Sequence, residues 1–218
     1  MIVKICGLTL LEDALAAAEL GANMLGFNFY PKSPRYISPT QCAKITSVLK
    51  ARYPELKLVG VFVNSEVAEI RSILGTCILD LAQLSGDEPP AMLLSLGSRA
   101  FKALRPENSS SLAQSLGIYP LRRENPAFLI DAFRKGDFGG TGQTADWSLA
   151  SQVARKHAIL LAGGLTPENV ASAIQQVHPW GVDVASGVEK APAIKDLSKI
   201  RAFIQAVRQV PSESSPGK

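Results

Sequence analysis

Of the 218 residues, 46% are hydrophobic and 19% are charged, so the chain can bury a sizeable core and global disorder is excluded. The net charge of +4 is spread along the sequence without a basic block, which gives no case for a nucleic-acid partner and suits a small anionic substrate. Three cysteines without CxxC spacing and two histidines argue against a disulfide framework or a zinc site and indicate a reducing cytoplasm.

The sequence contains neither a basic region followed by an apolar stretch of signal-peptide length nor a run of about 18 or more apolar residues. We therefore expect a protein of the cytoplasm with no membrane partner. The polar stretch PSESSPGK ends the sequence, and we expect residues 211–218 to form a disordered tail.

Short apolar, β-favouring runs alternate with longer segments of helical periodicity along the chain. The predicted strands cover 2–6, 24–29, 57–63, 77–84, 100–105, 127–131, 158–162 and 181–185. The predicted helices lie near 10–20, 39–52, 66–74, 88–97, 108–115, 146–156, 167–177 and 195–209. Two helix starts carry capping signals: Thr9 with Glu12 fits a capping box, and Thr166 precedes Pro167 at the first expected helical position.

Strict alternation of strands and helices is typical of the α/β class, and near-continuously apolar strands fit a parallel sheet that is buried on both faces. Eight such units indicate a single-domain (β/α)8 barrel, on a chain somewhat shorter than the usual ~250 residues. The alternative, an open doubly wound sheet, usually needs only about five or six strands. No linker rich in proline, glycine or serine interrupts the pattern, so we predict one barrel domain over residues 1–210.

Two glycine-containing loops follow the seventh and eighth predicted strands. In a (β/α)8 barrel, functional groups come from the C-terminal ends of the strands and from the loops after them. Gly163 and Gly164 follow the seventh strand, and Ser186 and Gly187 follow the eighth. Such residues leave backbone N–H groups that can surround an anion, and phosphate sites recur at these two loops. Both loops therefore predict a phosphate site, the alternative being that the glycines only make tight turns.

A third glycine-rich segment follows the sixth predicted strand. It contains Gly140, Thr141 and Gly142, and it could close over a ligand. Taken alone, the segment is weak evidence for a ligand-binding loop, because glycine-rich turns are common.

Cys6 and Asp131 stand at the C-terminal ends of the first and sixth predicted strands. In a closed eight-stranded ring these strands are close enough for the two side chains to face one another across the mouth. A thiol and a carboxyl group with well-separated pKa values could act as general base and general acid. The alternatives are a buried apolar thiol for Cys6 and a helix cap or an ion pair for Asp131.

Lys4 lies two residues before Cys6 and shares its face of the strand, which points into the barrel. An unpaired lysine there would be costly, and Asp183 in the adjacent eighth strand is the obvious counter-ion. We therefore predict a Lys4–Asp183 ion pair that is mainly structural and that favours the Cys6 thiolate.

Arg35 lies on a proline-stiffened loop after the second predicted strand. Its guanidinium could form two parallel hydrogen bonds with a substrate carboxylate. The alternative is an ordinary solvated arginine.

At these residues the sequence resembles the phosphoribosylanthranilate isomerase family of tryptophan biosynthesis. The matching stretches are VKICGLT, GFNFYPKSPRYIS, VGVFVN, QLSGDE, LIDAF, FGGTGQTADWSL, LAGGLTPENV and VDVASGVE, and in this order they cover nearly the whole chain. The combination of KICG, FYPKSPRYI and GGTGxTxDW is highly specific, whereas no single loop would be.

The resemblance implies a barrel without metal or cofactor that converts phosphoribosylanthranilate, an aminoaldose phosphate, to the corresponding 1-amino-1-deoxyribulose phosphate by an Amadori rearrangement. It makes Cys6 the general base that removes the proton from the sugar C2′, and Asp131 the general acid that protonates the ring oxygen. It assigns Arg35 to the anthranilate moiety and the loops after the seventh and eighth strands to the phosphate. The matching segment with Gly140, Thr141 and Gly142 is expected to bind substrate as well.

One position departs from the family, which usually has a histidine where this sequence has Ser85 in the stretch QLSG. Because both proposed catalytic groups are present, we expect altered binding or pH dependence rather than lost activity. Gln83, at the start of the same stretch, is expected to support the site together with Lys4 and Asp183.

Two other functions stay open. The related isomerase of the histidine pathway performs the same rearrangement on the same barrel, but that chemistry is expected to use two carboxylates, and Cys6 argues against it. A non-catalytic phosphosugar-binding protein could keep the phosphate loops, and the presence of both Cys6 and Asp131 argues against that function. Family members occur as monomers and dimers, so we expect a monomer or a homodimer.

Overall fold

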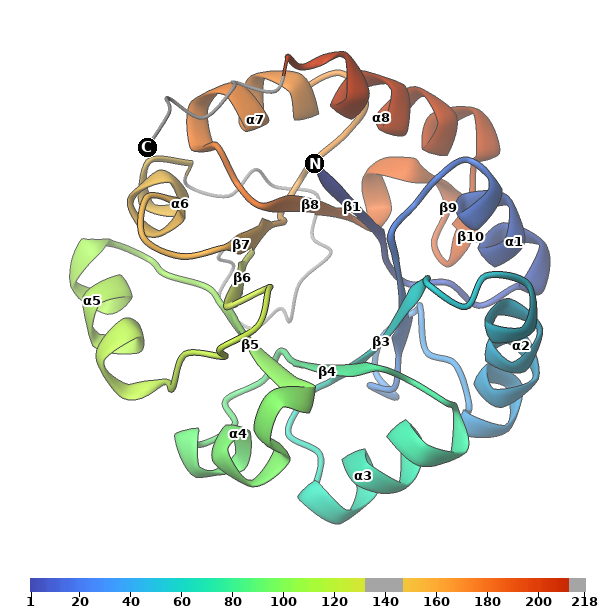
Figure 1. The fold of residues 1–218 in the computed structure, drawn as a ribbon, viewed down its shortest axis with the longest axis horizontal. Helices are drawn as coiled ribbons and strands as arrows, with labels where there is room; N and C mark the ends of the chain where they lie inside the picture. The colour runs from blue at the N-terminus through green and yellow to red at the C-terminus, as the bar shows by residue number, and fades with distance from the viewer. Residues whose placement is uncertain (132–146, 212–218) are drawn as a thin grey trace.

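Parallel strands close into a barrel, and helices surround it. The computed structural model describes residues 1–131 and 147–211, and within them eight strands pair in chain order, with the last strand pairing back to the first. Figure 1 looks along this ring and shows the helices outside it, so the predicted (β/α)8 barrel is confirmed. The strands are β1 (Ile2–Ile5), β2 (Met24–Asn28), β3 (Lys57–Phe62), β4 (Leu81–Leu84), β5 (Ala100–Leu104), β6 (Phe128–Ile130), β7 (Ile159–Leu161) and β8 (Gly181–Val184). The helices are α1 (Leu11–Glu19), α2 (Pro39–Arg52), α3 (Val67–Thr76), α4 (Pro90–Leu96), α5 (Ser109–Ile118), α6 (Trp147–Ala154), α7 (Val170–Val177) and α8 (Leu197–Gln209).

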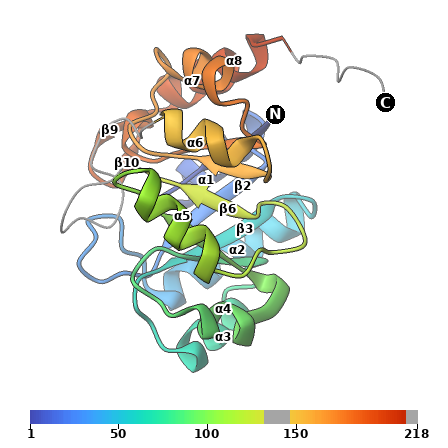
Figure 2. The same cartoon turned by 90° about the vertical axis from the view of Figure 1, so that its left-hand side faces the viewer.

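A short hairpin between β8 and α8 is absent from the sequence-based prediction. After a turn of 3₁₀ helix at Ser186–Val188, the chain forms the antiparallel pair β9 (Glu189–Ala191) and β10 (Ile194–Lys195). Figure 2 shows the hairpin at the side of the barrel that faces away from the N terminus. The hairpin therefore borders the mouth into which the C-terminal ends of the strands open.

The predicted fourth strand is wrong in its first half, because β4 begins only at Leu81. Cys77 caps helix α3 instead of starting a strand. Ile78 follows in a left-handed conformation with φ of 49°, and it is 51% exposed. The sequence over 77–80 resembles the start of a strand, but these residues form the turn that connects helix α3 to β4.

The two predicted capping signals are not used as expected. Helix α1 begins after Leu10, with no side-chain cap, and the Thr9 hydroxyl instead donates to the Ala193 carbonyl in the β9–β10 hairpin at 3.0 Å. Helix α7 begins at Val170 rather than at Pro167, because the chain first makes a turn. In both places a tertiary contact or a turn takes priority over the local capping pattern.

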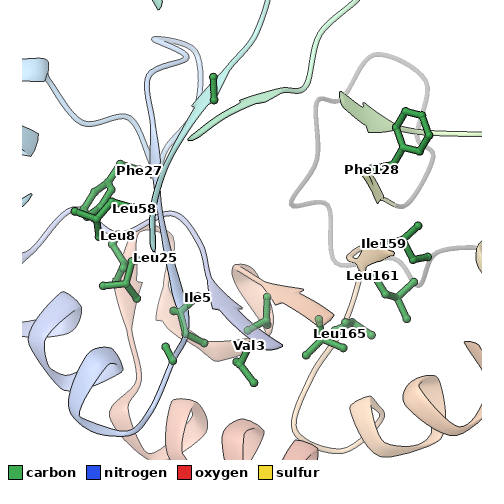
Figure 3. Close-up of a cluster of buried hydrophobic side chains, with 14 of the residues drawn as sticks. Val3, Ile5, Leu8, Leu25, Phe27, Leu58, Phe128, Ile159, Leu161 and Leu165 are labelled. Carbon is green, nitrogen blue, oxygen red and sulfur yellow. The ribbon is translucent and has the colours of Figure 1, made fainter. Parts of the chain in front are cut away.

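Buried apolar side chains form an inner and an outer layer, because successive residues of a strand point to opposite faces. Figure 3 shows part of the outer layer, in which Val3 and Ile5 of β1 lie close to Leu25 of β2, on the helix side of the strands. The inner layer fills the barrel with Met24, Val59, Leu81, Phe101, Ala103, Leu129, Leu160 and Ala162. None of the helices in the described part of the chain is both long enough and apolar enough to cross a membrane.

Candidate active site

A pocket at the C-terminal mouth of the barrel brings together most of the residues that the sequence selects. The residues on its wall include Cys6, Asn28, Ser33, Arg35, Gln83, Ser85, Asp131, Gly163, Gly164, Asp183 and Ser186. Lys4 and Gly187 are not on the wall, and Gly140, Thr141 and Gly142 lie outside the described residues. The thiol and the carboxyl group therefore open onto one cavity from different strands.

A second cavity, of about 600 Å³, lies at the opposite end of the barrel, where the strands begin. Ile2, Met24 and Lys57, from the starts of three neighbouring strands, contribute to its wall. Among residues 1–131 and 147–211, none of the predicted site residues lines this cavity. In this fold the chemistry is found at the other end.

Cys6 is fixed at the pocket wall by its backbone and by a glycine of β2. Its N–H donates to the Val184 carbonyl at 2.8 Å, and the residue is 8% exposed. A Cβ atom on Gly26 would lie 2.6 Å from the Cys6 Sγ, so a glycine is needed there to leave room for the sulfur. The thiol is therefore closely packed and still borders the cavity.

The predicted ion pair between Lys4 and Asp183 is present. Lys4 Nζ lies 2.8 Å from Asp183 Oδ1, and the two residues are direct neighbours across the β1–β8 pairing. Burial on its own would lower the pKa of Lys4, but Asp183 and the Cys6 sulfur outweigh it, and the pKa is raised. Lys4 is therefore a permanent cation inside the barrel.

Burial has the largest effect on the Cys6 thiol and raises its pKa above the ordinary value. The charge of Lys4 acts against this rise, whereas the carboxylate of Asp183 adds to it. Lys4 thus favours the thiolate, as expected, but its partner disfavours it. The combined effect is a raised pKa, so the surroundings of Cys6 in the free protein favour the neutral thiol.

Asp131 directly follows β6. Its backbone N–H donates to the Leu104 carbonyl at 3.0 Å, which extends the pairing of β6 with β5 by one residue. Asp131 is half-buried, so it is less enclosed than Cys6. Asp131 thus lines the pocket from the C-terminal end of β6.

Arg35 lines the pocket, and Glu189, which was not predicted as a site residue, holds its guanidinium in place. Its Nε and Nη2 donate to the two carboxylate oxygens of Glu189, at 2.8 and 2.7 Å. This fork is the main cause of the raised pKa of Arg35. Nη1 takes no part in the fork with Glu189, so together with the second N–H of Nη2 it offers donors for a substrate carboxylate.

Glu189 and Lys195 connect Arg35 to the loop after β8. Lys195 Nζ donates to Glu189 Oε1 and to the Ala185 carbonyl, each at 2.9 Å. Burial on its own would raise the pKa of Glu189, but Arg35 and Lys195 together lower it. The partners Arg35 and Glu189 are 154 positions apart in the sequence, so no local pattern predicts their contact.

The loop after β2 is shaped by polar groups that also border the pocket. The Asn28 side chain donates to Ser33 Oγ at 3.1 Å, and Ser33 Oγ accepts from the Arg35 backbone N–H at 3.1 Å. Gly7, with φ of 75°, lies against Arg35, because a Cβ atom there would be 2.5 Å from the arginine Cδ. A polar residue at the end of an apolar strand was the signal that could have identified Asn28.

The two predicted phosphate loops lie against one another. Gly163 and Gly164 both have left-handed conformations, with φ of 92° and 67°, which turns successive N–H groups toward one side of the chain. A Cβ atom on Gly187 would collide with the Leu165 carbonyl oxygen, so glycine permits the close approach of the loops. Ser186 borders the pocket beside them.

Gln83 and Ser85 line the pocket from β4 and the residue after it. Gln83 Nε2 donates to Ser85 Oγ at 3.1 Å, and both residues are buried.

Among residues 1–131 and 147–211, no group of three or more histidine, cysteine, aspartate or glutamate side chains is arranged to hold a metal ion. The described groups suit proton transfer on an anionic ligand, with a thiol, a carboxyl group, a forked arginine and two loops of backbone amides.

Comparison with known proteins agrees with this geometry. The family model described as N-(5′-phosphoribosyl)anthranilate isomerase matches residues 3–206. A protein of that name from Pelobacter propionicus is 46% identical over 213 residues, which is 98% of each chain. Another, from Syntrophus aciditrophicus, is 46% identical over 95% of this chain and 87% of its own.

Solved structures give the same result. Phosphoribosyl anthranilate isomerase from Thermotoga maritima superposes with a TM-score of 0.85 at 40% identity, over 95% of this chain and 99% of its own. A structure of a phosphoribosyl anthranilate isomerase in complex with reduced 1-(o-carboxyphenylamino)-1-deoxyribulose 5-phosphate superposes with a TM-score of 0.80 at 39% identity, over 95% of this chain and 99% of its own. The chain belongs to the N-(5′-phosphoribosyl)anthranilate isomerase family.

Proposed function

We propose that this protein is an isomerase that converts N-(5′-phosphoribosyl)anthranilate to 1-(2-carboxyphenylamino)-1-deoxyribulose 5-phosphate, an Amadori rearrangement of tryptophan biosynthesis. The observation that carries the proposal is the single pocket shared by Cys6 and Asp131, with Arg35 and two glycine loops on its wall. Family membership supports the same reaction.

Asp131 is the general acid of the first step. Its protonated carboxyl group gives a proton to the ring oxygen of the ribose, and the bond from C1′ to that oxygen breaks. The nitrogen lone pair forms the C1′=N bond of a Schiff base, which carries the positive charge. This role requires a protonated carboxyl group at the pocket wall, which is where Asp131 lies.

Cys6 is the general base of the second step. Its thiolate removes the proton from C2′, and the electrons of that C–H bond form C1′=C2′ while the nitrogen becomes neutral. The resulting enol takes up a proton at C1′ and loses its hydroxyl proton to give the ketone. The two steps leave the composition of the sugar unchanged, so the reaction needs no oxidant or reductant.

The remaining groups hold the two anionic ends of the substrate. The backbone N–H groups around Gly163, Gly164 and Ser186 bind the phosphate, and Arg35 binds the anthranilate carboxylate through Nη1. Lys195 and Glu189 join these two regions through the contacts described above. The substrate thus extends across the mouth of the barrel, with its sugar between Cys6 and Asp131.

The test is turnover of phosphoribosylanthranilate, followed by the loss of anthranilate fluorescence. We expect Cys6→Ser and Asp131→Asn each to lower kcat by roughly 10²- to 10⁴-fold, the usual contribution of a general acid or base. Both variants should still bind the reduced product. If the unmodified protein turns over no faster than the variants while all three bind the reduced product, the protein is a binding module and the proposal is wrong.

A further inference from the structure

Gln83 is a buried polar residue that points into the barrel. It lies two residues after Leu81, which belongs to the inner apolar layer, so the two side chains share one face of β4. Only 6% of Gln83 is exposed, yet the residue borders the pocket. Its side chain therefore forms part of the pocket floor above the apolar layer.

The amide of Gln83 is only half satisfied. Its Nε2 donates to Ser85 Oγ, whereas its Oε1 is buried and accepts no hydrogen bond from any residue in 1–131 or 147–211. A buried acceptor without a partner costs free energy, and such a group calls for an explanation such as a bound water, an ion or a role in the reaction. Gln83 borders a pocket, so a ligand bound there can supply the missing partner.

The chemistry of Oε1 restricts which part of a ligand it can meet. An amide oxygen only accepts hydrogen bonds, so it is a poor partner for a phosphate or a carboxylate, which are mainly deprotonated at neutral pH and act as acceptors themselves. In the closed ring β4 lies opposite β8, away from the two phosphate loops. The group that Gln83 meets is therefore an N–H or O–H donor at the end of the substrate remote from the phosphate.

We propose that Gln83 Oε1 accepts a hydrogen bond from the amine nitrogen that links the sugar to the anthranilate ring. This inference rests on the proposed function, which supplies the substrate. When the ring opens, this N–H becomes part of the positively charged Schiff base. A hydrogen bond to a charged donor is stronger than one to a neutral donor, so Gln83 stabilises the intermediate more than the bound substrate.

Ser85 is the positioning residue in this arrangement. Ser85 Oγ accepts a hydrogen bond from Gln83 Nε2 at 3.1 Å. This contact holds the amide so that Oε1 points away from the Ser85 hydroxyl. Without that contact the amide can rotate and present its NH₂ group to the substrate amine. Loss of the Ser85 hydroxyl should therefore reproduce part of the effect of losing Gln83.

The variant Gln83→Met keeps the length of the side chain and removes its polar end. We expect an unchanged or higher thermal midpoint, because the unsatisfied acceptor disappears. We also expect kcat to fall by about ten- to a hundred-fold, and affinity for the reduced product by only about two- to ten-fold, since the hydrogen bond to the neutral amine is weaker. Leu81→Met, on the same face of β4, is the matched control and should leave kcat unchanged.

Two further comparisons identify the bonded atom. Ser85→Ala should lower kcat by less than Gln83→Met, and Ser85→Thr, which keeps the hydroxyl, should restore it. An analogue of the reduced product with an ether oxygen in place of the amine should bind unmodified protein and Gln83→Met equally. Equal loss of affinity for the amine and the ether would place the bond at a sugar hydroxyl and overturn the proposal.

A lower thermal midpoint together with unchanged kcat in Gln83→Met would show a purely structural role and would also overturn it. The failure of the proposed function is a separate result, because it would appear as absent turnover in the unmodified protein. The hydrogen bond of Gln83 can still be tested in that case, because the affinities of the unmodified protein and of Gln83→Met for the reduced product are measured without turnover.

Discussion

The Cys6 thiol is influenced by both members of the buried Lys4–Asp183 ion pair. Lys4 lowers the pKa of Cys6 and Asp183 raises it, while burial raises it most. The base must be deprotonated and the acid protonated to act, so the plot of kcat/KM against pH should be bell-shaped. Because the two charges are themselves bonded at 2.8 Å, a change to either one alters the other as well.

Lys4→Met should therefore have two separable effects. The thiol pKa should rise because the charge that favours the thiolate is gone, so kcat/KM at neutral pH should fall and the alkaline limb of the bell should move to higher pH. The free energy of unfolding should fall by about 3–5 kcal/mol, because Asp183 becomes a buried carboxylate without its partner. A pH–rate profile and urea unfolding measure these effects independently.

The double variant Lys4→Met with Asp183→Leu is the control. It replaces both charges by apolar groups and should recover most of the lost stability. The pH profile should still differ from that of the unmodified protein. An unchanged profile in Lys4→Met would show that the lysine does not act on the thiol.

At the scale of elements, close contacts between neighbouring strands and loops place the functional groups. Strand β2 approaches Cys6 at a glycine, and the loop after β7 approaches the loop after β8 at another. The β9–β10 hairpin supplies Glu189 and Lys195, which hold Arg35. The geometry of the mouth thus depends on how closely adjacent elements can pack.

Gly26→Ala should test the contact between β2 and the thiol. The added Cβ would lie 2.6 Å from the Cys6 Sγ and 3.1 Å from its Cα, so the two strands or the sulfur must move. We expect a loss of about 1–3 kcal/mol of stability, as in other overpacked cores, and a lower kcat. Gly75→Ala, in helix α3 with open space around its Cβ, should gain about 0.5–1 kcal/mol and keep full activity.

Glu189→Gln should test the hairpin. The carboxylate has a pKa lowered from its ordinary value of 4.5, so it stabilises the fold at higher pH and this contribution is lost as the pH falls through the lowered value. The variant should be less stable than the unmodified protein at pH 7, and the difference should shrink in acid. Urea unfolding at both pH values measures it, and a difference that stays constant would contradict the expected ion-pair role.

For the whole molecule, the barrel could be predicted because the alternation of strand and helix is local. The position of the site could be predicted as well, because functional groups of a (β/α)8 barrel lie at the C-terminal ends of the strands and in the loops after them. Cys6, Arg35 and Asp131 were selected in this way, and they line one pocket. The fork between Arg35 and Glu189 could not be predicted, because it depends on how distant segments meet. The missing partner of Gln83 likewise becomes visible only when the packing around its amide is known.

The first and last strands meet at a seam, and the Lys4–Asp183 pair lies on it. A chain emerging from the ribosome carries Cys6 from the start, but the aspartate that balances its neighbouring lysine is made near the end. The sulfur therefore acquires its working environment only when the final strand docks. A fragment that stops before Gly181, mixed with the missing C-terminal piece, would link the recovery of turnover directly to closure of the ring.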